Sequence, residues 1–152
     1  MRHIIGLAGL ASHRRPRLSS NVRPQKTATV PRRISEDPKR EARIRDEIVV
    51  DSYNESERAM GWYCYIEAQL AFSFSASCRS KRSMSPLKVG EQVRVVAMAP
   101  EDDCTSEVYV FVKYGRSKLA VPLGQLDCHT SDENTSQAVA DWHYWQARGY
   151  EY

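Results

Sequence analysis

The sequence predicts an α+β domain in which a small SH3-like antiparallel β-barrel is flanked by N-terminal helices and a C-terminal helix. The barrel prediction depends on residues 87–126, where apolar and polar residues alternate at the period of two that pleated strands require. Two such runs, 93–97 and 108–113, precede the turn sequence 114–117, which is typical of a tight hairpin. Helical patterns on either side are expected to cover this sheet.

Two helices are predicted before the barrel. Asp37 is placed to cap a helix that begins at Pro38 and extends to about Val50, because proline is tolerated at the first helical position. Asn54 and Glu57 form a variant capping box for a second helix. Its apolar stripe has helical spacing and is expected to pack on the barrel. The stripe consists of Ala59, Met60, Tyr63, Cys64, Ile66 and Leu70.

A strand and a final helix complete the expected elements. Residues 72–78 alternate strictly between serine and apolar residues, which predicts the first strand of the sheet, and the basic, serine-rich residues 79–86 are expected to form a loop. From about Thr135 to Arg148 a helical pattern places Trp142 and Trp145 on one face. Two tryptophans on a terminal helix indicate that it docks on the core.

Charge divides the chain unevenly. Residues 1–35 contain eight Lys or Arg and no Asp or Glu, whereas residues 46–152 contain ten Lys or Arg and sixteen Asp or Glu. We therefore expect residues 1–36 to be a basic disordered arm, or a leader or misassigned start, and residues 37–152 to be a single acidic domain. A mean hydropathy of -0.57 and the lack of an apolar span predict a soluble globular protein without membrane contact.

The sequence contains no recognisable catalytic constellation. It has no P-loop and no GxGxxG, GxSxG or HExxH motif, so we expect a protein that is not an enzyme. The cysteines form no CxxC pair and are expected to be buried free thiols. A zinc site from Cys128, His129 and His143, with Cys104 as a further ligand, stays open as an alternative, although the spacing matches no closed structural site.

Carboxylates in the connecting segments suggest a calcium site, because Ca²⁺ prefers six to eight oxygen ligands. Some of these acids also have a purely structural explanation, since carboxylates near a helix N-terminus complement the helix dipole. Residues 101–103 precede no predicted helix, so we expect them to form the site with a further carboxylate from Asp127 or Asp51. No EF-hand pattern occurs. The candidate ligands are Glu101, Asp102, Asp103, Asp127, Asp132, Glu133 and Asp51.

Several short motifs resemble one known family. They are residues 48–51 (IVVD), 57–63 (ERAMGWY), 85–90 (SPLKVG), 98–102 (MAPED), 119–123 (LAVPL), 141–145 (DWHYW) and 148–150 (RGY). Together they resemble the CcbP-like calcium-binding proteins described from cyanobacteria, over residues from about 40 to 152. The resemblance implies a cytoplasmic, non-EF-hand calcium-binding protein that acts as a buffer or a sensor. The basic arm has no counterpart in that family pattern.

A second function remains open at this point. A small barrel can also serve as an interaction module that binds a protein partner or nucleic acid, with the basic arm as its electrostatic anchor. The acidic domain repels phosphate, so nucleic acid is expected to bind only through the arm. Calcium-dependent stabilisation would distinguish a calcium binder from such a module.

Overall fold

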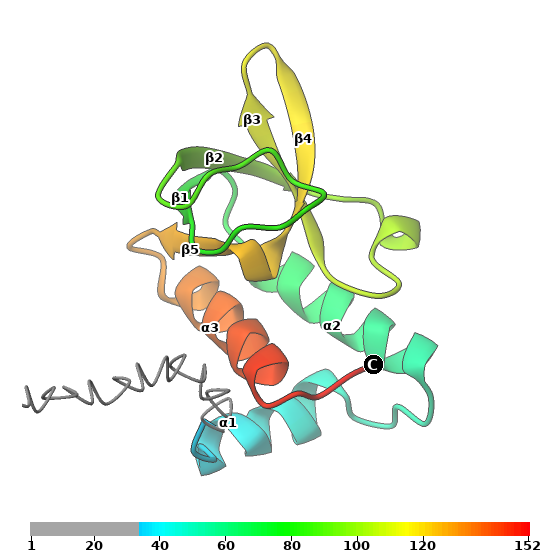
Figure 1. Ribbon diagram of the computed structural model, residues 1–152. Helices are drawn as coiled ribbons and strands as arrows, with labels where there is room; N and C mark the ends of the chain where they lie inside the picture. The colour runs from blue at the N-terminus through cyan, green and yellow to red at the C-terminus, as the bar shows by residue number, and fades with distance from the viewer. Residues whose placement is uncertain (1–33) are drawn as a thin grey trace, which may run out of the picture. The chain divides into compact units, whose positions relative to one another are not determined.

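The computed structural model describes residues 34–152, which form a sheet covered on one side by helices (Figure 1). The helical elements are α1 (Pro38–Arg43), a π-helical turn η1 (Ile44–Ile48), α2 (Glu55–Gln69), two short 3₁₀ turns η2 (Glu101–Asp103) and η3 (Leu123–Gln125), and α3 (Glu133–Ala147). The strands are β1 (Phe74–Cys78), β2 (Gln92–Met98), β3 (Tyr109–Tyr114), β4 (Ser117–Pro122) and β5 (Leu126–His129).

The sheet is antiparallel, with the strand order β4-β3-β2-β1-β5. It confirms the α+β class but is not closed into the predicted SH3-like barrel, because β4 and β5 remain its two edges. Two local features explain the open sheet: Pro122 ends β4 without an N–H for further pairing, and β5 has only four residues. β5 itself lies in a segment that the sequence pattern assigned to a loop, because its four residues are too few for a clear alternation.

The core lies between the sheet and the pair α2 and α3, which run side by side beneath it (Figure 1). Trp62 on α2 is fully buried, and its ring centroid lies 5.1 Å from that of Trp142 and 5.4 Å from that of Trp145. The docking of the last helix through its tryptophans is therefore confirmed. The predicted stripe on α2 is wrong in detail: Met60 and Cys64 are exposed, and Trp62 takes the central position.

Asp141 fastens α1 to α3 and α2. Its carboxylate is fully buried and accepts hydrogen bonds from Arg43 Nε and Nη2 at 2.8 and 2.7 Å, and from the Tyr65 hydroxyl at 2.8 Å. The Arg40 Nε atom approaches the same carboxylate at 2.9 Å. The hydrogen bonds that Arg43 donates to the Asp141 carboxylate raise the pKa of Arg43 above its ordinary value. The sequence pattern gave no sign of this network.

The close approach of η1 to α2 depends on Gly61. A Cβ atom at this position would collide with the backbone carbonyl oxygen of Ile48, which is buried against α2. The predicted motif at residues 57–63 therefore includes a glycine for a steric reason.

The predicted helix caps are present. Asp37 accepts hydrogen bonds from the backbone N–H groups of Lys39 and Arg40, and Asn54 accepts one from Glu57. The last helix begins two residues earlier than predicted, at Glu133, because Asp132 is its capping residue.

Two further predictions concern the N-terminal arm and contact with a membrane. The basic arm assigned to residues 1–36 lies almost wholly outside the described residues. Within residues 34–152, none of the helices has both the length and the apolar character needed to cross a membrane.

Candidate metal centre

The turn between β2 and β3 presents three adjacent carboxylates, from Glu101, Asp102 and Asp103, and all three residues are exposed. The turn closes with backbone hydrogen bonds from Asp103 N to Pro100 O (3.0 Å) and from Cys104 N to Glu101 O (2.9 Å). A short helical turn with exposed acids is thus built into the sheet connection. We call residues 101–103 the acidic turn.

Buried residues hold both ends of the acidic turn. Ala99 before it and Cys104 after it are only 1% and 2% exposed, and both pack against Tyr63 of α2. The Tyr63 hydroxyl donates to the Ala99 carbonyl at 3.0 Å, and burial raises the pKa of Tyr63. Burial likewise raises the pKa of the Cys104 thiol. The backbone of the turn is therefore anchored, while its carboxylates face solvent.

Glu101 and Asp102 border a small hollow of about 160 Å³ between the acidic turn and the start of α2. Ser56 of α2 and Thr105 after the turn also line the hollow, whose remaining border is formed by Ala59, Met60, Tyr63 and Cys104. Asp103 belongs to the turn but does not line the hollow. Two residues with carboxylates and two with aliphatic hydroxyls thus border one hollow, and both groups are hard oxygen donors.

No lysine or arginine pairs with the acidic turn in the part of the chain that the structure describes. Adjacent carboxylates repel one another when both are ionised, and a bound cation relieves that repulsion. The carboxylates of the turn are therefore available to a cation.

Asp127 lies far from the acidic turn along the sheet. In β1, Ser77 is opposite both Asp127 of β5 and Gln92 at the start of β2, whereas the acidic turn follows the other end of β2. The Asp127 carboxylate also faces Arg79 Nε at 3.7 Å. The register therefore does not bring Asp127 to the turn as the predicted completing ligand.

Asp132 and Glu133 occupy the start of α3. Asp132 accepts a hydrogen bond from the backbone N–H of Thr135 at 2.7 Å, and its bonds to Thr135 lower the pKa of its carboxyl group. Glu133 is in the first helical turn, where its charge complements the helix dipole. The sequence analysis gave acids near a helix N-terminus a structural role. That role accounts for the positions of Asp132 and Glu133 at the start of α3.

Asp51 lies in the tight turn between η1 and α2, with a φ of 56°. It borders a second hollow, of about 690 Å³, together with Glu47 and Glu57. This hollow shares Ser56 and Met60 with the hollow at the acidic turn. Asp51 and the acidic turn thus border two hollows that meet at the first part of α2.

The donor set fits calcium in an open site. Among residues 34–152 no three Asp, Glu, His or Cys side chains are grouped closely enough to hold a metal by themselves. Ca²⁺ accepts carbonyl, hydroxyl and water oxygens beside carboxylates, so a site with two or three carboxylates is chemically complete when other oxygens take part. The same observation applies to the zinc alternative, since Cys128, His129 and His143 form no such group among residues 34–152.

The residues proposed as zinc ligands differ from one another in exposure and contacts. His129 is exposed, and its Nε2 atom lies 2.8 Å from the Ser77 hydroxyl. Burial lowers the pKa of His143 on α3 and raises that of the half-buried Cys128. Of the four cysteines, only Cys78 and Cys104 are fully buried, so the expectation of buried thiols holds for these two.

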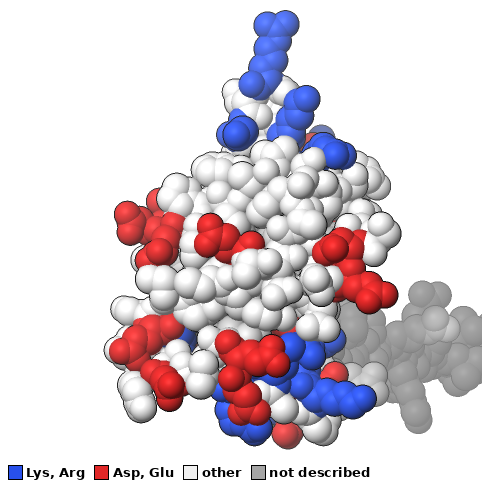
Figure 2. Space-filling model, turned by 180° about the vertical axis from the view of Figure 1, so that it is seen from behind, with Lys and Arg blue, Asp and Glu red and all other residues white. Residues whose placement is uncertain are grey.

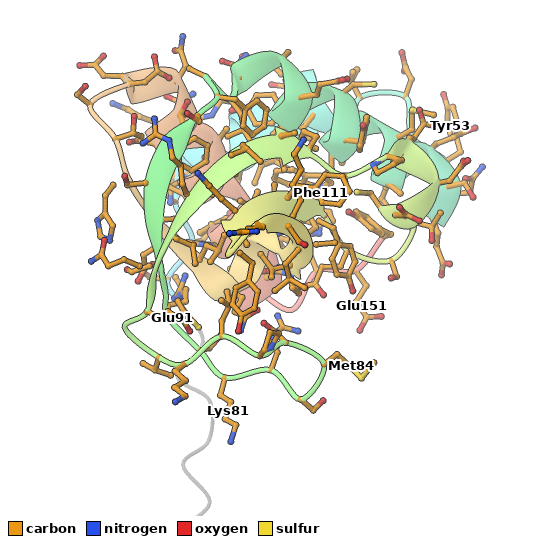
Figure 3. All side chains as sticks on the ribbon, turned by 90° about the horizontal axis from the view of Figure 1, so that it is seen from above. Tyr53, Lys81, Met84, Glu91, Phe111 and Glu151 are labelled. Atoms are coloured by element: carbon orange, nitrogen blue, oxygen red, sulfur yellow. The ribbon has the colours of Figure 1, made fainter. Side chains whose placement is uncertain are left out.

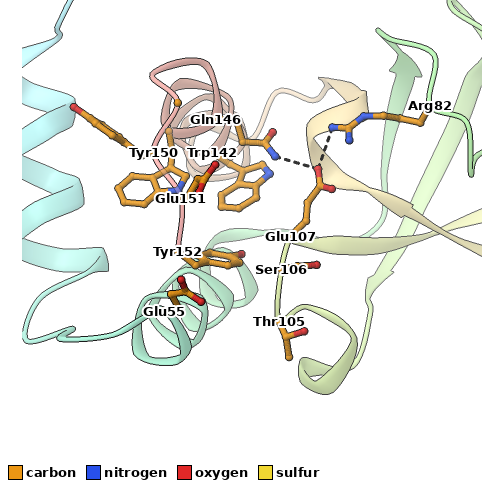
Figure 4. A pocket seen from close by; sticks show the side chains of 12 residues that line it. Glu55, Arg82, Thr105, Ser106, Glu107, Trp142, Gln146, Tyr150, Glu151 and Tyr152 are labelled. Atoms are coloured by element: carbon orange, nitrogen blue, oxygen red, sulfur yellow. Dashed lines mark hydrogen bonds and ion pairs between the residues drawn. The ribbon is translucent and has the colours of Figure 1, made fainter.

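A third hollow, of about 500 Å³, is lined by three acids, of which sequence reasoning missed Glu107 and Glu151. Glu55, Glu107 and Glu151 line it beside aromatic residues of α3 and the C-terminal segment (Figure 4). Arg82 Nη2 and Gln146 Nε2 each donate to Glu107 at 3.0 Å, so this carboxylate is already paired (Figure 4). No local pattern could place Glu151 here, because the path of the last residues depends on tertiary contacts.

The structure is that of a small α+β protein with an exposed acidic turn that forms no ion pair among residues 34–152. The calcium-binding family model named for CcbP matches residues 42–146, and the chain belongs to this family. No curated protein shows a match to the chain.

Two solved structures share the fold. The crystal structure of Anabaena CcbP is 38% identical, with a TM-score of 0.70, and the match covers 78% of this chain and 98% of that one. A calcium binding protein in the calcium-binding form is 37% identical, with a TM-score of 0.69, and the match covers 77% and 96% of the two chains.

Proposed function

We propose that this protein binds calcium at the acidic turn and acts as a calcium buffer. Membership of a calcium-binding family supports the choice of ion. The observation that carries the choice of site is the hollow where Glu101 and Asp102 meet Ser56 and Thr105. These carboxylates have no lysine or arginine partner among the described residues, unlike Asp127.

In this proposal each group has a defined part. Glu101 and Asp102 supply the charge that attracts Ca²⁺, and Asp103 adds a third negative charge on the same turn. Hydroxyl and backbone oxygens around the hollow contribute neutral ligands. Calcium is preferred over magnesium, because Mg²⁺ demands near-ideal octahedral geometry and an exposed turn does not impose it.

The anchoring of the turn favours a buffer over a sensor. A sensor needs an element with two arrangements that the ion selects between. The acidic turn is instead held by the buried residues Ala99 and Cys104 and by the hydrogen bond from Tyr63. Calcium binding is therefore expected to neutralise the turn without opening the core.

Calorimetric titration tests the site. Asp102→Asn combined with Asp103→Asn should weaken calcium affinity at least tenfold, which corresponds to about 1.4 kcal/mol. The apo protein should be as stable as the wild type or more so, because the variant relieves repulsion. Thermal unfolding of the apo forms checks that the fold is intact.

A matched control removes two charges elsewhere. Asp127→Asn with Glu133→Gln changes the net charge by the same amount and should leave calcium affinity within twofold of the wild type. If this control loses affinity and the Asp102/Asp103 variant keeps it, the site lies at the start of α3. If the wild type binds no calcium, the proposed function is wrong.

The buffer assignment has its own measurement. Near-ultraviolet circular dichroism reports on the packing of Trp62, Trp142 and Trp145 and should change little at saturating calcium. Dye binding to exposed apolar surface should also stay constant. A large change in either signal would identify a sensor that opens on binding.

A further inference from the structure

The face of the sheet opposite the helices carries a row of polar residues in register. Lys113 of β3 is directly opposite Arg94 of β2 on one side and Lys118 of β4 on the other. Directly paired residues point to the same face of a sheet, so the three cationic side chains stand side by side. Further along the row, Ser75 of β1 is opposite both Arg94 and His129 of β5. We call Arg94, Lys113 and Lys118 the cation row.

The cation row is exposed and has no anionic partner. All three residues are solvent-exposed, and none forms an ion pair within residues 34–152. Arg94 Nε donates to the Ser73 hydroxyl at 3.0 Å, which fixes the direction of its side chain. Like charges directly opposite one another destabilise a sheet, so this arrangement costs stability in the free protein. A bound anion would remove that cost.

The hairpin that carries the row is free of acids. Residues 108–121 contain no Asp or Glu and include a further cation, Arg116, at the hairpin turn. In Figure 2 one group of lysines and arginines stands at the end of the molecule that this hairpin forms, apart from the acidic residues, and a second group lies among acids at the opposite end. On the same face Asp127 stands in the next row, opposite Ser77, where it faces Arg79. The excess of acids in the domain is thus separated from the row.

An aromatic residue lies close to the cation row on β3. Phe111 lies two residues before Lys113, so it points to the same side of the strand at a separation of roughly 7 Å. Phe111 borders a hollow of about 460 Å³ together with Phe72, which is 38% exposed, and with Tyr63 and Glu67 of α2. The bulge of β2 at Val96, where the register shifts between Val95 and Ala97, borders the same hollow. The hollow therefore lies where the sheet meets α2, and Phe111 is the aromatic residue that connects it to the cation row.

We propose that this face binds single-stranded nucleic acid, with phosphates on the cation row and a base stacked in the hollow at Phe111. The pairing of a basic track with exposed aromatic rings is how proteins bind single strands without sequence preference. A single strand fits better than a duplex, because its bases are free to stack on a side chain. An acidic polypeptide would use the cations but has no ring for the hollow. This inference does not depend on calcium binding.

Fluorescence anisotropy with a labelled oligothymidylate tests the proposal on the full chain. Lys113→Gln with Lys118→Gln should lower the affinity at least tenfold at low salt. The slope of log affinity against log salt should become shallower by about 1.4, because each lost phosphate contact on a single strand accounts for about 0.7. Melting should show an equal or higher transition temperature, since two repelling charges are removed.

The control is Lys81→Gln with Lys88→Gln in the 79–91 loop. Both residues are exposed, and Lys81 projects outward from this loop (Figure 3). The change in net charge is identical, and all variants keep residues 1–33, so any contribution of those residues cancels. The control should bind as the wild type does. Equal losses in the two variants would mean that general charge attracts the oligonucleotide, and this would overturn the proposal.

Phe111→Leu separates nucleic acid from acidic polypeptide. This variant keeps an apolar side chain but removes the ring, so it should weaken oligothymidylate binding at least threefold with an unchanged salt slope. Polyglutamate of equal charge should compete poorly. If polyglutamate displaces the oligonucleotide at equal concentration of charge and Phe111→Leu has no effect, the face is a site for acidic polypeptides. Absence of any oligonucleotide binding by the wild type would also refute the inference.

Discussion

Asp141 and the acidic turn use the same chemical group in opposite ways. The Asp141 carboxylate is fully buried, with two arginines and a tyrosine hydroxyl around its oxygens. The carboxylates of Glu101, Asp102 and Asp103 are exposed and lack a cationic partner among the described residues. Residues of the fold balance the charge of Asp141, whereas no described residue balances the charges of the acidic turn.

Because of this difference, we base the proposed cation site on the availability of carboxylate oxygens and not on the density of acids. Glu107 and Asp132 lie among other acids in the sequence or in space, yet both are already hydrogen-bonded to partners that orient them. Such carboxylates would have to give up existing bonds to coordinate an ion. Those of the acidic turn would not.

The largest expected effect is the loss of stability on truncation of Trp142, which tests the packing next to Asp141. Trp142 is 2% exposed and contacts Trp62, so Trp142→Ala should lower the free energy of unfolding by about 3 to 5 kcal/mol. Urea denaturation followed by circular dichroism measures this loss. Trp142→Phe retains most of the apolar contact and should lose less. An unchanged urea midpoint for Trp142→Ala would show that α3 is not fastened through this residue.

Removal of the buried carboxylate should have the next largest effect. Asp141→Ala leaves Arg43 and Arg40 without their anion and should cost about 3 kcal/mol, at the lower end for buried pairs because both arginines reach solvent. The same change at the acidic turn, Asp102→Ala, should alter stability by less than about 0.5 kcal/mol. Urea midpoints of the two variants compare the regions directly. Equal losses would contradict the distinction between them.

Asp132 tests whether an acid near other acids is structural. Asp132→Ala removes the cap of α3 and should cost about 1 kcal/mol of stability, while calcium affinity measured by calorimetry should not change. Asp132→Ser keeps a capping oxygen and should recover most of the loss. Weaker calcium binding in both variants would assign Asp132 to the ion site instead.

The smallest expected effect concerns pH. Burial lowers the pKa of His143, so the unfolded chain binds a proton more readily than the folded protein does. Stability should therefore decrease as the pH falls from about 7.5 through the ordinary histidine pKa of 6.5. His143→Gln should show a flatter dependence of the urea midpoint on pH over this range. A profile identical to that of the wild type would exclude His143 as the cause.

Local sequence patterns predicted the elements that depend on local physics. The capping residues Asp37 and Asn54 and the hairpin turn at Gly115, with its φ of 59°, all follow from preferences of single residues or short motifs. The alternation in residues 74–78 likewise predicted a strand with one buried face. Each of these signals is contained in fewer than ten residues.

Features set by distant contacts could not be predicted in the same way. The burial of Trp62 depends on α3, which lies about eighty residues later, and the network at Asp141 joins three helices. The acidic turn was identified because its neighbours in sequence form it. Its separation from Asp127 follows from the pairing of β1 with β5, a long-range register that composition does not encode.

The open sheet leaves two borders at which a foreign strand could add its own backbone. Natural proteins guard such borders with charge, proline or short length, since an unprotected edge invites fibrous self-association. Here Lys118 and Pro122 stand on β4, and β5 offers only four residues. The same lysine that we assign to ligand contact thus also acts as a gatekeeper, so its removal should be monitored for aggregation during storage as well as for binding.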